Sequence, residues 1–138
     1  MAAEHMVDVE VLTPEGEVFN GEVRQVSTRT AVGELGILAN HAPLLAALAP
    51  TELRLLGGDG EETVRYAQAH GWLQVFGNHA KLLVEEALDP AELDAGTLKE
   101  QLADAEQRLS ESEEGSGAYA RAEKDRDRAE AFLAIAQG

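Results

Sequence analysis

The clearest absence in this chain of 138 residues is cysteine, and basic and aromatic residues are scarce. Without cysteine the chain has no disulfide, no thiolate metal site and no cysteine nucleophile, which is compatible with a cytosolic setting. Eleven Lys and Arg stand against 26 Asp and Glu, for a formal net charge of −15. This negative charge repels a phosphate backbone, so we expect no nucleic acid partner.

Long hydrophobic runs are also missing. No apolar stretch approaches the roughly 20 residues that a membrane-spanning helix needs. Residues 1–11, MAAEHMVDVEV, lack the basic start and apolar centre of a signal peptide. The sequence therefore predicts a protein that is not exported and is not inserted directly into a membrane. Its hydrophobic fraction of 44% is nevertheless sufficient for a folded core.

Motifs for catalysis are absent as well. The chain has neither a GxxxxGK[ST] phosphate loop nor a GxSxG nucleophile elbow. Its histidines, His5, His41, His70 and His79, do not have the HxxxH or HExxH spacing of a metal site. His70 and His79 lie close to glycines, where a solvated or turn-capping histidine is usual. We expect no catalytic residue, no metal and no cofactor.

Residues 7–88 have the pattern of β-strands. Val7, Val9 and Val11 alternate with acidic residues, and further short apolar runs follow at the spacing of turns. The segments GGDGEE and GNH are typical of hairpin connections. This pattern predicts an antiparallel β-sandwich over residues 1–88. The Ala/Leu run after Pro43 is compatible with either a helix or a buried strand.

The segment WLQVF, residues 72–76, is predicted to be one of these strands. Alternation places Trp72 and Gln74 on one face and Leu73 and Val75 on the other. Trp72, Leu73 and Phe76 are candidates for the core or for an interface, and we expect most of them to lie in the core.

From residue 89 onward the apolar period becomes helical. The segment DPAE at 89–92 resembles a capping box, either at the start of the helix or in a short turn before it. An apolar stripe then recurs at steps of four, three and four, at Leu98, Leu102, Ala105 and Leu109. The segment SESEEGSG ends this helix, and a second helix is expected at about 118–136. The chain is therefore predicted to be mainly β within the α+β class, with an antiparallel two-helix hairpin at 89–138.

Four segments together resemble the ε subunit of bacterial F-type ATP synthases. They are the opening VxVLTPEGxVFxGEV, the stretch GELGILANHAPLLAAL at 33–48, the GW pair at 71–72 and the Ala-rich helical hairpin. The resemblance runs from about Val7 to the C-terminus. It implies a non-catalytic rotor subunit in the central stalk, which couples proton flow through the c-ring to ATP synthesis. It also implies a peripheral position at the cytoplasmic face of the cell membrane.

The resemblance assigns roles within residues 33–48. The sandwich would pack on the γ subunit and rest on the polar loops of the c-ring, with Glu34 and His41 as c-ring contacts. Gly33 and Gly36 would serve the backbone through a positive φ or a bulge, and Pro43 would fix the turn. From the residues alone, His41 could instead cap this turn through a hydrogen bond.

The resemblance also implies a regulatory role for the hairpin. It would fold down on the sandwich or extend along γ towards the α and β subunits, where it restrains ATP hydrolysis. Arg121, Lys124 and Arg128 share one helix face at i, i+3 and i+7. They form either a solvated face of mixed charge or the inhibitory contacts to the catalytic β subunit.

Some relatives in the resembled family bind ATP through an I/L-D-x-x-R-A pattern, with a second arginine seven residues later. Leu93 and Asp94 match that pattern, but Thr97 and Asp104 stand at the arginine positions. Because cations are lost and a carboxylate is gained, we expect weak or absent ATP binding. The alternative function, from another class, is a free-standing adaptor or ligand sensor, which would form no tight complex with γ.

Overall fold

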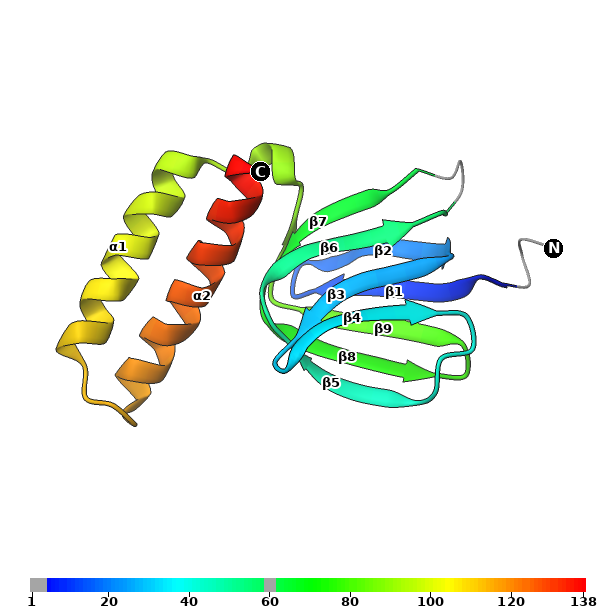
Figure 1. The fold of residues 1–138 in the computed structure, drawn as a ribbon, viewed down its shortest axis with the longest axis horizontal. Coiled ribbons are helices and arrows are strands. Elements are labelled where there is room, and N and C mark those ends of the chain that lie inside the picture. Colours follow the sequence, from blue (N-terminus) through cyan, green and yellow to red (C-terminus); the bar gives the residue numbers. More distant parts are fainter. Residues whose placement is uncertain (1–4, 59–61) are drawn as a thin grey trace. The chain divides into compact units, whose positions relative to one another are not determined.

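The computed structural model describes residues 5–58 and 62–138. The chain forms two compact units, one ending at Asp89 and the other beginning at Pro90. The first unit consists of strands and the second of helices (Figure 1). The predicted class, mainly β with two C-terminal helices, is confirmed.

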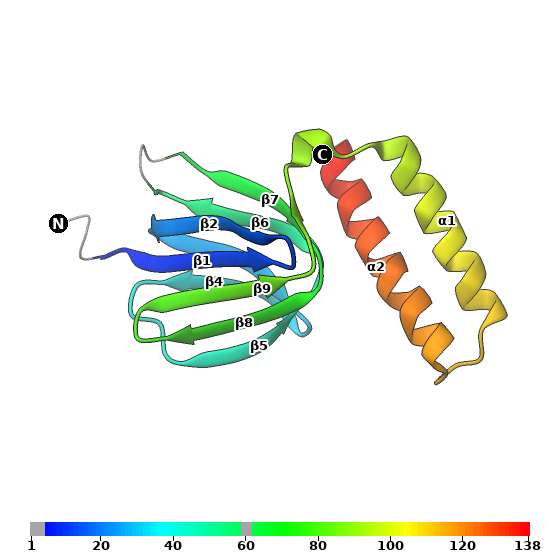
Figure 2. The same ribbon diagram turned by 180° about the vertical axis from the view of Figure 1, so that it is seen from behind.

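The first unit is one continuous sheet that folds over on itself (Figures 1 and 2). Its strands are β1 (Val7–Thr13), β2 (Gly16–Val23), β3 (Gln25–Thr30), β4 (Gly33–Leu38), β5 (Leu44–Leu48), β6 (Thr51–Leu56), β7 (Val64–Gln68), β8 (Gly71–Phe76), β9 (His79–Val84) and β10 (Ala87–Leu88). They follow the order β10-β7-β6-β3-β5-β8-β9-β1-β2, with β4 attached to β3. The Ala/Leu run after Pro43 is therefore a strand, β5.

A single core joins the two sides of the folded sheet. Its members are the inward-facing aliphatic side chains of the strands, namely Val7, Val9, Val11, Val23, Val26, Ile37, Leu48, Leu53, Leu55, Leu73, Val75, Ala80, Leu82 and Val84. They alternate with outward-facing residues, as the period of two predicted. Because both layers contribute to this cluster, the unit is a β-sandwich.

One pairing departs from the antiparallel prediction. Strand β1 runs antiparallel to β2 on one side and parallel to β9 on the other, with Asp8 opposite His79. The other described ladders are antiparallel. A parallel pair needs a long connection, and here residues 14–78, which include strands β2 to β8, connect β1 to β9.

The predicted hairpin at GNH is confirmed. Gly77 and Asn78 have φ values of 58° and 60°, as a two-residue turn between antiparallel strands requires. Asn78 also ties distant segments together, because its side chain donates to the Met6 carbonyl at 3.0 Å and accepts from the Asn40 N–H at 2.7 Å. The other predicted connection, GGDGEE, includes residues 59–61, which lie outside the described residues.

The expectation of a core position is wrong for Trp72 and Phe76. Trp72 is 55% exposed and Phe76 is 70% exposed, whereas Leu73 and Val75 of the same strand are at most 1% exposed. The alternation along β8 was predicted correctly. Its apolar residues lie on both faces, however, and a period of two does not say which face is inward.

The second unit is an antiparallel helical hairpin. It contains a short 3₁₀ helix (Pro90–Glu92), then α1 (Ala95–Glu111) and α2 (Gly117–Gln137). The DPAE segment thus forms a separate turn, and Asp94 caps α1 by accepting from the Gly96 N–H at 3.1 Å. Ser116 caps α2 by accepting from the Tyr119 N–H at 3.1 Å. Among the described helices, none has the length and apolar character needed to cross a membrane.

The two helices meet along a seam of small residues. The buried side chains of the hairpin are Leu98, Ala105, Ala122, Ala129 and Phe132, while Leu102 and Leu109 of the predicted stripe are half-buried. Arg108 links the helices at the surface, since its guanidinium lies 2.9 Å from an Asp104 oxygen on α1 and 2.8 Å from an Asp125 oxygen on α2. These hydrogen bonds, first to Asp125 and then to Asp104, raise the pKa of Arg108.

Candidate partner-binding surfaces

Gly33 closes the turn between β3 and β4. Its φ is 140°, in a region that side chains rarely adopt, although a Cβ there would meet nothing within 4 Å. Thr30 stabilises the turn: its hydroxyl donates to the Gly33 carbonyl at 3.0 Å and accepts from the Val32 N–H at 3.2 Å. The requirement for glycine at position 33 is therefore conformational and not steric.

Gly36 lies in the middle of β4 opposite Ser27, in a ladder without a register shift. It is not among the described residues with a positive φ. The expectation of an unusual φ or a bulge is therefore wrong for Gly36, because the pattern of two glycines does not say which one occupies the turn. A Cβ at this position would lie 2.9 Å from the amide nitrogen at the tip of the Gln25 side chain.

Glu34 is the second residue of β4, opposite Arg29 on β3. Its side chain is 82% exposed, and one of its carboxylate oxygens lies 3.6 Å from an Arg29 guanidinium nitrogen. A surface pair of this kind contributes only about 0–1 kcal/mol. The carboxylate is therefore accessible, and little energy is needed to exchange Arg29 for a different cation.

His41 belongs to the turn that follows β4. Its ring Nδ1 lies 2.7 Å from the Ala42 carbonyl oxygen, and its backbone N–H donates to the Leu38 carbonyl at 3.2 Å. Since a carbonyl only accepts, Nδ1 carries the proton and Nε2 is left for another contact. Pro43 then leads directly into β5.

The structure does not bring Glu34 and His41 into direct contact. Glu34 lies near the start of β4, and His41 lies three residues beyond its end. The four residue-to-residue steps from Glu34 to Leu38 span about 13 Å at 3.3 Å per step. A partner that touches both residues must therefore extend along the whole strand.

The three predicted cations of α2 differ in their surroundings. Arg121 and Lys124 are exposed. Arg128 is half-buried: it donates to the Gln101 side chain of α1 at 3.2 Å, and its guanidinium carbon lies 4.6 Å from the centre of the Phe132 ring. In this hairpin Arg128 therefore helps to hold the two helices together.

Comparison with known proteins decides the family. A family described as "ATP synthase, Delta/Epsilon chain, beta-sandwich domain" matches residues 6–90. The ATP synthase epsilon chain of Persephonella marina is 42% identical over 132 residues, which cover 95% of this chain and 96% of that one. That of a Sulfurihydrogenibium species is 40% identical over 134 residues, which cover 95% and 97%. The chain belongs to the ATP synthase epsilon chain family.

As an epsilon chain it is a non-catalytic subunit of the ATP synthase complex. Two solved structures share its fold. In the mitochondrial ATP synthase of Euglena gracilis, one chain aligns with a TM-score of 0.79 and 21% identity, covering 94% of this chain and 80% of that chain. In that of Tetrahymena thermophila the TM-score is 0.62 at 20% identity, with 94% and 95% covered. At these identities the likeness is one of fold.

In this epsilon chain, acidic residues at the positions of the ATP-binding pattern form local hydrogen bonds at the start of α1 and along it. Asp94 accepts from the Thr97 hydroxyl at 2.7 Å as well as from the Gly96 N–H, and Asp104 accepts from Arg108. The hydrogen bond from Thr97, and then that from Gly96, lower the pKa of Asp94. The weak or absent ATP binding expected from Thr97 and Asp104 stays a prediction.

Sequence reasoning missed one polar cluster, which joins β1 to β9. The two ring nitrogens of His79 lie 2.8 Å from an Asp8 oxygen and 3.2 Å from a Glu10 oxygen. Both can be donors only in the protonated imidazolium, which would bridge the two carboxylates. The parallel register of β1 and β9 creates this contact, and no spacing in the sequence indicates that register. Within the described ranges no group of His, Asp and Glu is arranged to hold a metal ion.

Proposed function

We propose that this epsilon chain is a rotor subunit in the central stalk of an F-type ATP synthase, where it helps to couple proton flow through the c-ring to ATP synthesis. The observation that carries this proposal is the full-length match: relatives named ATP synthase epsilon chain are 40–42% identical over both units. The solved structures of the same fold are parts of an F1/c-ring assembly and of a central stalk/c-ring assembly. We do not favour a free-standing adaptor, because the relatives that match both units of this chain are named ATP synthase epsilon chains.

The sandwich provides the attachment. It binds the γ subunit and rests on the polar loops of the c-ring, at the cytoplasmic face of the membrane and without entering it. Glu34 and His41 are the c-ring contacts. Supporting this role, the Glu34 carboxylate is 82% exposed and the ring of His41 is oriented by the Ala42 carbonyl.

The helical hairpin provides the regulation. When extended towards the α and β subunits it restrains ATP hydrolysis, with Arg121, Lys124 and Arg128 as the contacting cations. Arg121 and Lys124 are exposed on the folded hairpin, whereas Arg128 must first leave Gln101 and the Phe132 ring. Arg128 is therefore presented only when the hairpin opens.

Co-purification with the cognate γ subunit, followed by ATPase assays of the assembled complex, tests both roles. We expect a one-to-one complex, and a higher hydrolysis rate when the chain ends at Asp89. Full-length Arg121→Gln with Lys124→Gln should raise the rate in the same direction, while Lys99→Gln on α1 serves as the matched control. Failure to bind γ would refute the rotor role, and an unchanged rate after truncation would refute the inhibitory role.

Proton pumping by the reconstituted enzyme tests the c-ring contacts. Glu34→Gln together with His41→Gln should lower the protons pumped per ATP hydrolysed, because both polar contacts to the c-ring loops are lost. Glu15→Gln, in the exposed turn between β1 and β2, is the control. If pumping efficiency stays at the control value, Glu34 and His41 are not coupling contacts.

A further inference from the structure

Asn78 uses three of its polar groups to join segments that lie far apart in the chain. It occupies the turn between β8 and β9, where its backbone carbonyl accepts from the Asp8 N–H at 3.2 Å. Its side chain donates to the Met6 carbonyl at 3.0 Å and accepts from the Asn40 N–H at 2.7 Å. One residue thus connects the β8–β9 turn to the start of β1 and to residues 39–43, the connection between β4 and β5.

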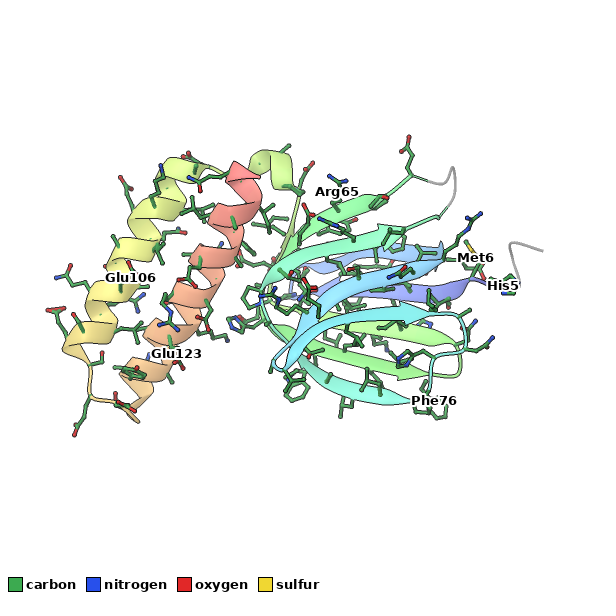
Figure 3. The ribbon with its side chains drawn as sticks, viewed as in Figure 1. His5, Met6, Arg65, Phe76, Glu106 and Glu123 are labelled. Carbon is green, nitrogen blue, oxygen red and sulfur yellow. The ribbon has the colours of Figure 1, made fainter. Side chains whose placement is uncertain are left out.

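These three segments meet at one end of the sandwich. Figures 1 and 2 show the connection from β4 to β5 beside the turn from β8 to β9 at that end. Figure 3 shows Met6, directly before β1, and Phe76, the last residue of β8, at the same end. Leu44, the first residue of β5, lies opposite Val75 of β8. The pairing of β5 with β8 therefore brings the connection alongside Asn78.

The backbone at position 78 restricts which residues suit this turn. Its φ is 60°, a left-handed conformation that glycine, asparagine and aspartate adopt more readily than most residues. Glycine would fit the turn, but it has no side chain to reach Asn40 or Met6. Aspartate has two acceptors and no donor, so it could accept from the Asn40 N–H but would repel the Met6 carbonyl. Asparagine provides the turn conformation and both side-chain hydrogen bonds.

The connection that Asn78 contacts belongs to no strand, and it carries His41. The His41 N–H donates to the Leu38 carbonyl at 3.2 Å, and Asn40 has a φ of 60°. A hydrogen bond from the fourth residue to the first, with a positive φ at the third, is the geometry of a type II turn. Such a turn uses the N–H of its fourth residue, His41. It leaves the N–H of its third residue, Asn40, to donate to Asn78.

The place of the His41 ring depends on this turn. Its Nδ1 lies 2.7 Å from the carbonyl oxygen of the next residue, Ala42, so the backbone of the connection orients the ring. The hydrogen bond from Asn40 to Asn78 anchors that backbone to the rest of the sandwich. Without this anchor the ring would keep its bond to Ala42 but would move with the connection relative to the sheet. Ring orientation is therefore local, while ring placement depends on Asn78.

We propose that Asn78 is a positioning residue for the c-ring contact, which fixes residues 39–43 on the sandwich so that Nε2 of His41 is presented at a constant place. This inference rests on the proposed rotor function, in which His41 contacts the polar loops of the c-ring. Asn78 acts through Asn40 and His41 and needs no contact with the c-ring itself. Because a loop held in place beforehand loses less conformational freedom on binding, the anchor favours the contact.

Proton pumping by the reconstituted enzyme tests this role in full-length variants. Asn78→Gly keeps the left-handed turn and loses both side-chain hydrogen bonds, so its loss of protons pumped per ATP hydrolysed should equal that of His41→Gln. Asn78→Asp still accepts from the Asn40 N–H and should retain most of the wild-type efficiency. Asn20→Gly is the matched control, because it removes an exposed side chain of β2 and its hydrogen bond to Glu17. Control-level pumping by Asn78→Gly, or equal losses in Asn78→Gly and Asn78→Asp, would overturn the proposal.

Combined substitutions separate positioning from a general effect on the fold. Adding Asn78→Gly to His41→Gln should lower pumping no further, because Asn78 has then lost the residue through which it acts. Additive losses would show that Asn78 acts independently of His41 and would overturn the proposal. If His41→Gln alone pumps at the wild-type level, the c-ring contact fails, and this inference fails with it.

Amide hydrogen exchange in the isolated full-length chain tests the anchor without the rotor. The Asn40 N–H should exchange at least about tenfold faster in Asn78→Gly than in the wild-type chain, and should stay protected in Asn78→Asp. The His41 N–H, which is bonded to Leu38, should change less. Unchanged exchange at Asn40 in Asn78→Gly would overturn the anchor whatever the pumping assays give. This measurement therefore distinguishes a missing anchor from a missing c-ring contact.

Discussion

The sandwich and the helical hairpin are stabilised to very different degrees. The sandwich core combines Val, Leu and Ile side chains from β1 to β6 and from β8 and β9 in one cluster. The buried residues of the hairpin are Leu98 and Phe132 with three alanines between them. Apolar burial contributes about 25 cal/mol per Å², so the sandwich is self-sufficient while the hairpin is marginal. A marginal unit is one that a partner can rearrange at low cost.

We expect the largest destabilisation of the sandwich at Gly71, where the backbones of β8 and β9 lie close together. A Cβ on Gly71 would overlap the Leu83 carbonyl oxygen and lie 2.7 Å from the Val84 Cα, so β8 and β9 would have to separate. We expect Gly71→Ala to lower the free energy of unfolding by about 3 kcal/mol in urea denaturation. Gly36→Ala is the control, because only the flexible tip of Gln25 has to move. Equal midpoints for the two variants would contradict this account.

Phe132 is the corresponding weak point of the hairpin. Its side chain is fully buried and is the largest in a seam otherwise made mainly of alanine. Phe132→Ala should cost about 3–5 kcal/mol, enough to unfold a marginal unit. We expect the helical circular dichroism signal to fall while the exposed Trp72 reports an intact sandwich. Loss of both signals together would mean that the two units unfold as one.

Arg108 makes a smaller contribution, because it acts at the surface of the hairpin. Arg108→Gln removes the link from α1 to Asp125 on α2, whereas Arg126→Gln removes contacts within α2 alone, to Asp127 and Glu123. We expect a modest decrease in the melting temperature of the hairpin for Arg108→Gln only, which shrinks at high salt. A larger effect from Arg126→Gln would show that the interhelical link is unimportant.

Asp94 gives the hairpin a pH dependence of its own. The pKa of Asp94 is lowered in the folded chain by the Thr97 hydroxyl and the Gly96 N–H. A lowered pKa stabilises the fold above the unfolded value, and this stability is lost as pH falls through the folded value. Helix α1 should therefore weaken below about pH 4, near the ordinary aspartate pKa. Asp94→Asn keeps a capping oxygen but has no titration, so its helicity should vary less with pH over that range. Identical pH profiles would assign the effect to other carboxylates.

The sequence predicted the local elements better than it predicted their partners. The alternation at Val7, Val9 and Val11 and the helical stripe from Leu98 to Leu109 identify strand and helix, because periodicity is a local property. It leaves open which face of β8 is inward, and Trp72 was therefore wrongly expected in the core.

The pairing of distant segments was the least predictable part of the site. The His79 cluster depends on the parallel register of β1 and β9, which joins residues about 70 positions apart in the chain. Similarly, Arg128 was predicted to lie on one face with Arg121 and Lys124, but its contact with Gln101 depends on how α1 and α2 pack. Such contacts follow from tertiary structure, and local spacing carries no signal for them.

The parallel pairing of β1 with β9 also sets the order in which the protein can be made. Strand β1 leaves the ribosome before the other described strands, yet one of its two neighbours, β9, ends only at Val84. The sandwich therefore closes late, because contacts between distant parts of the chain form slowly. Residues 90–138 follow β9 in the chain and form a separate unit. During synthesis the edge of β1 that pairs with β9 stays unpaired until β9 is available. The nascent chain is therefore most prone to aggregation before β9 pairs with β1.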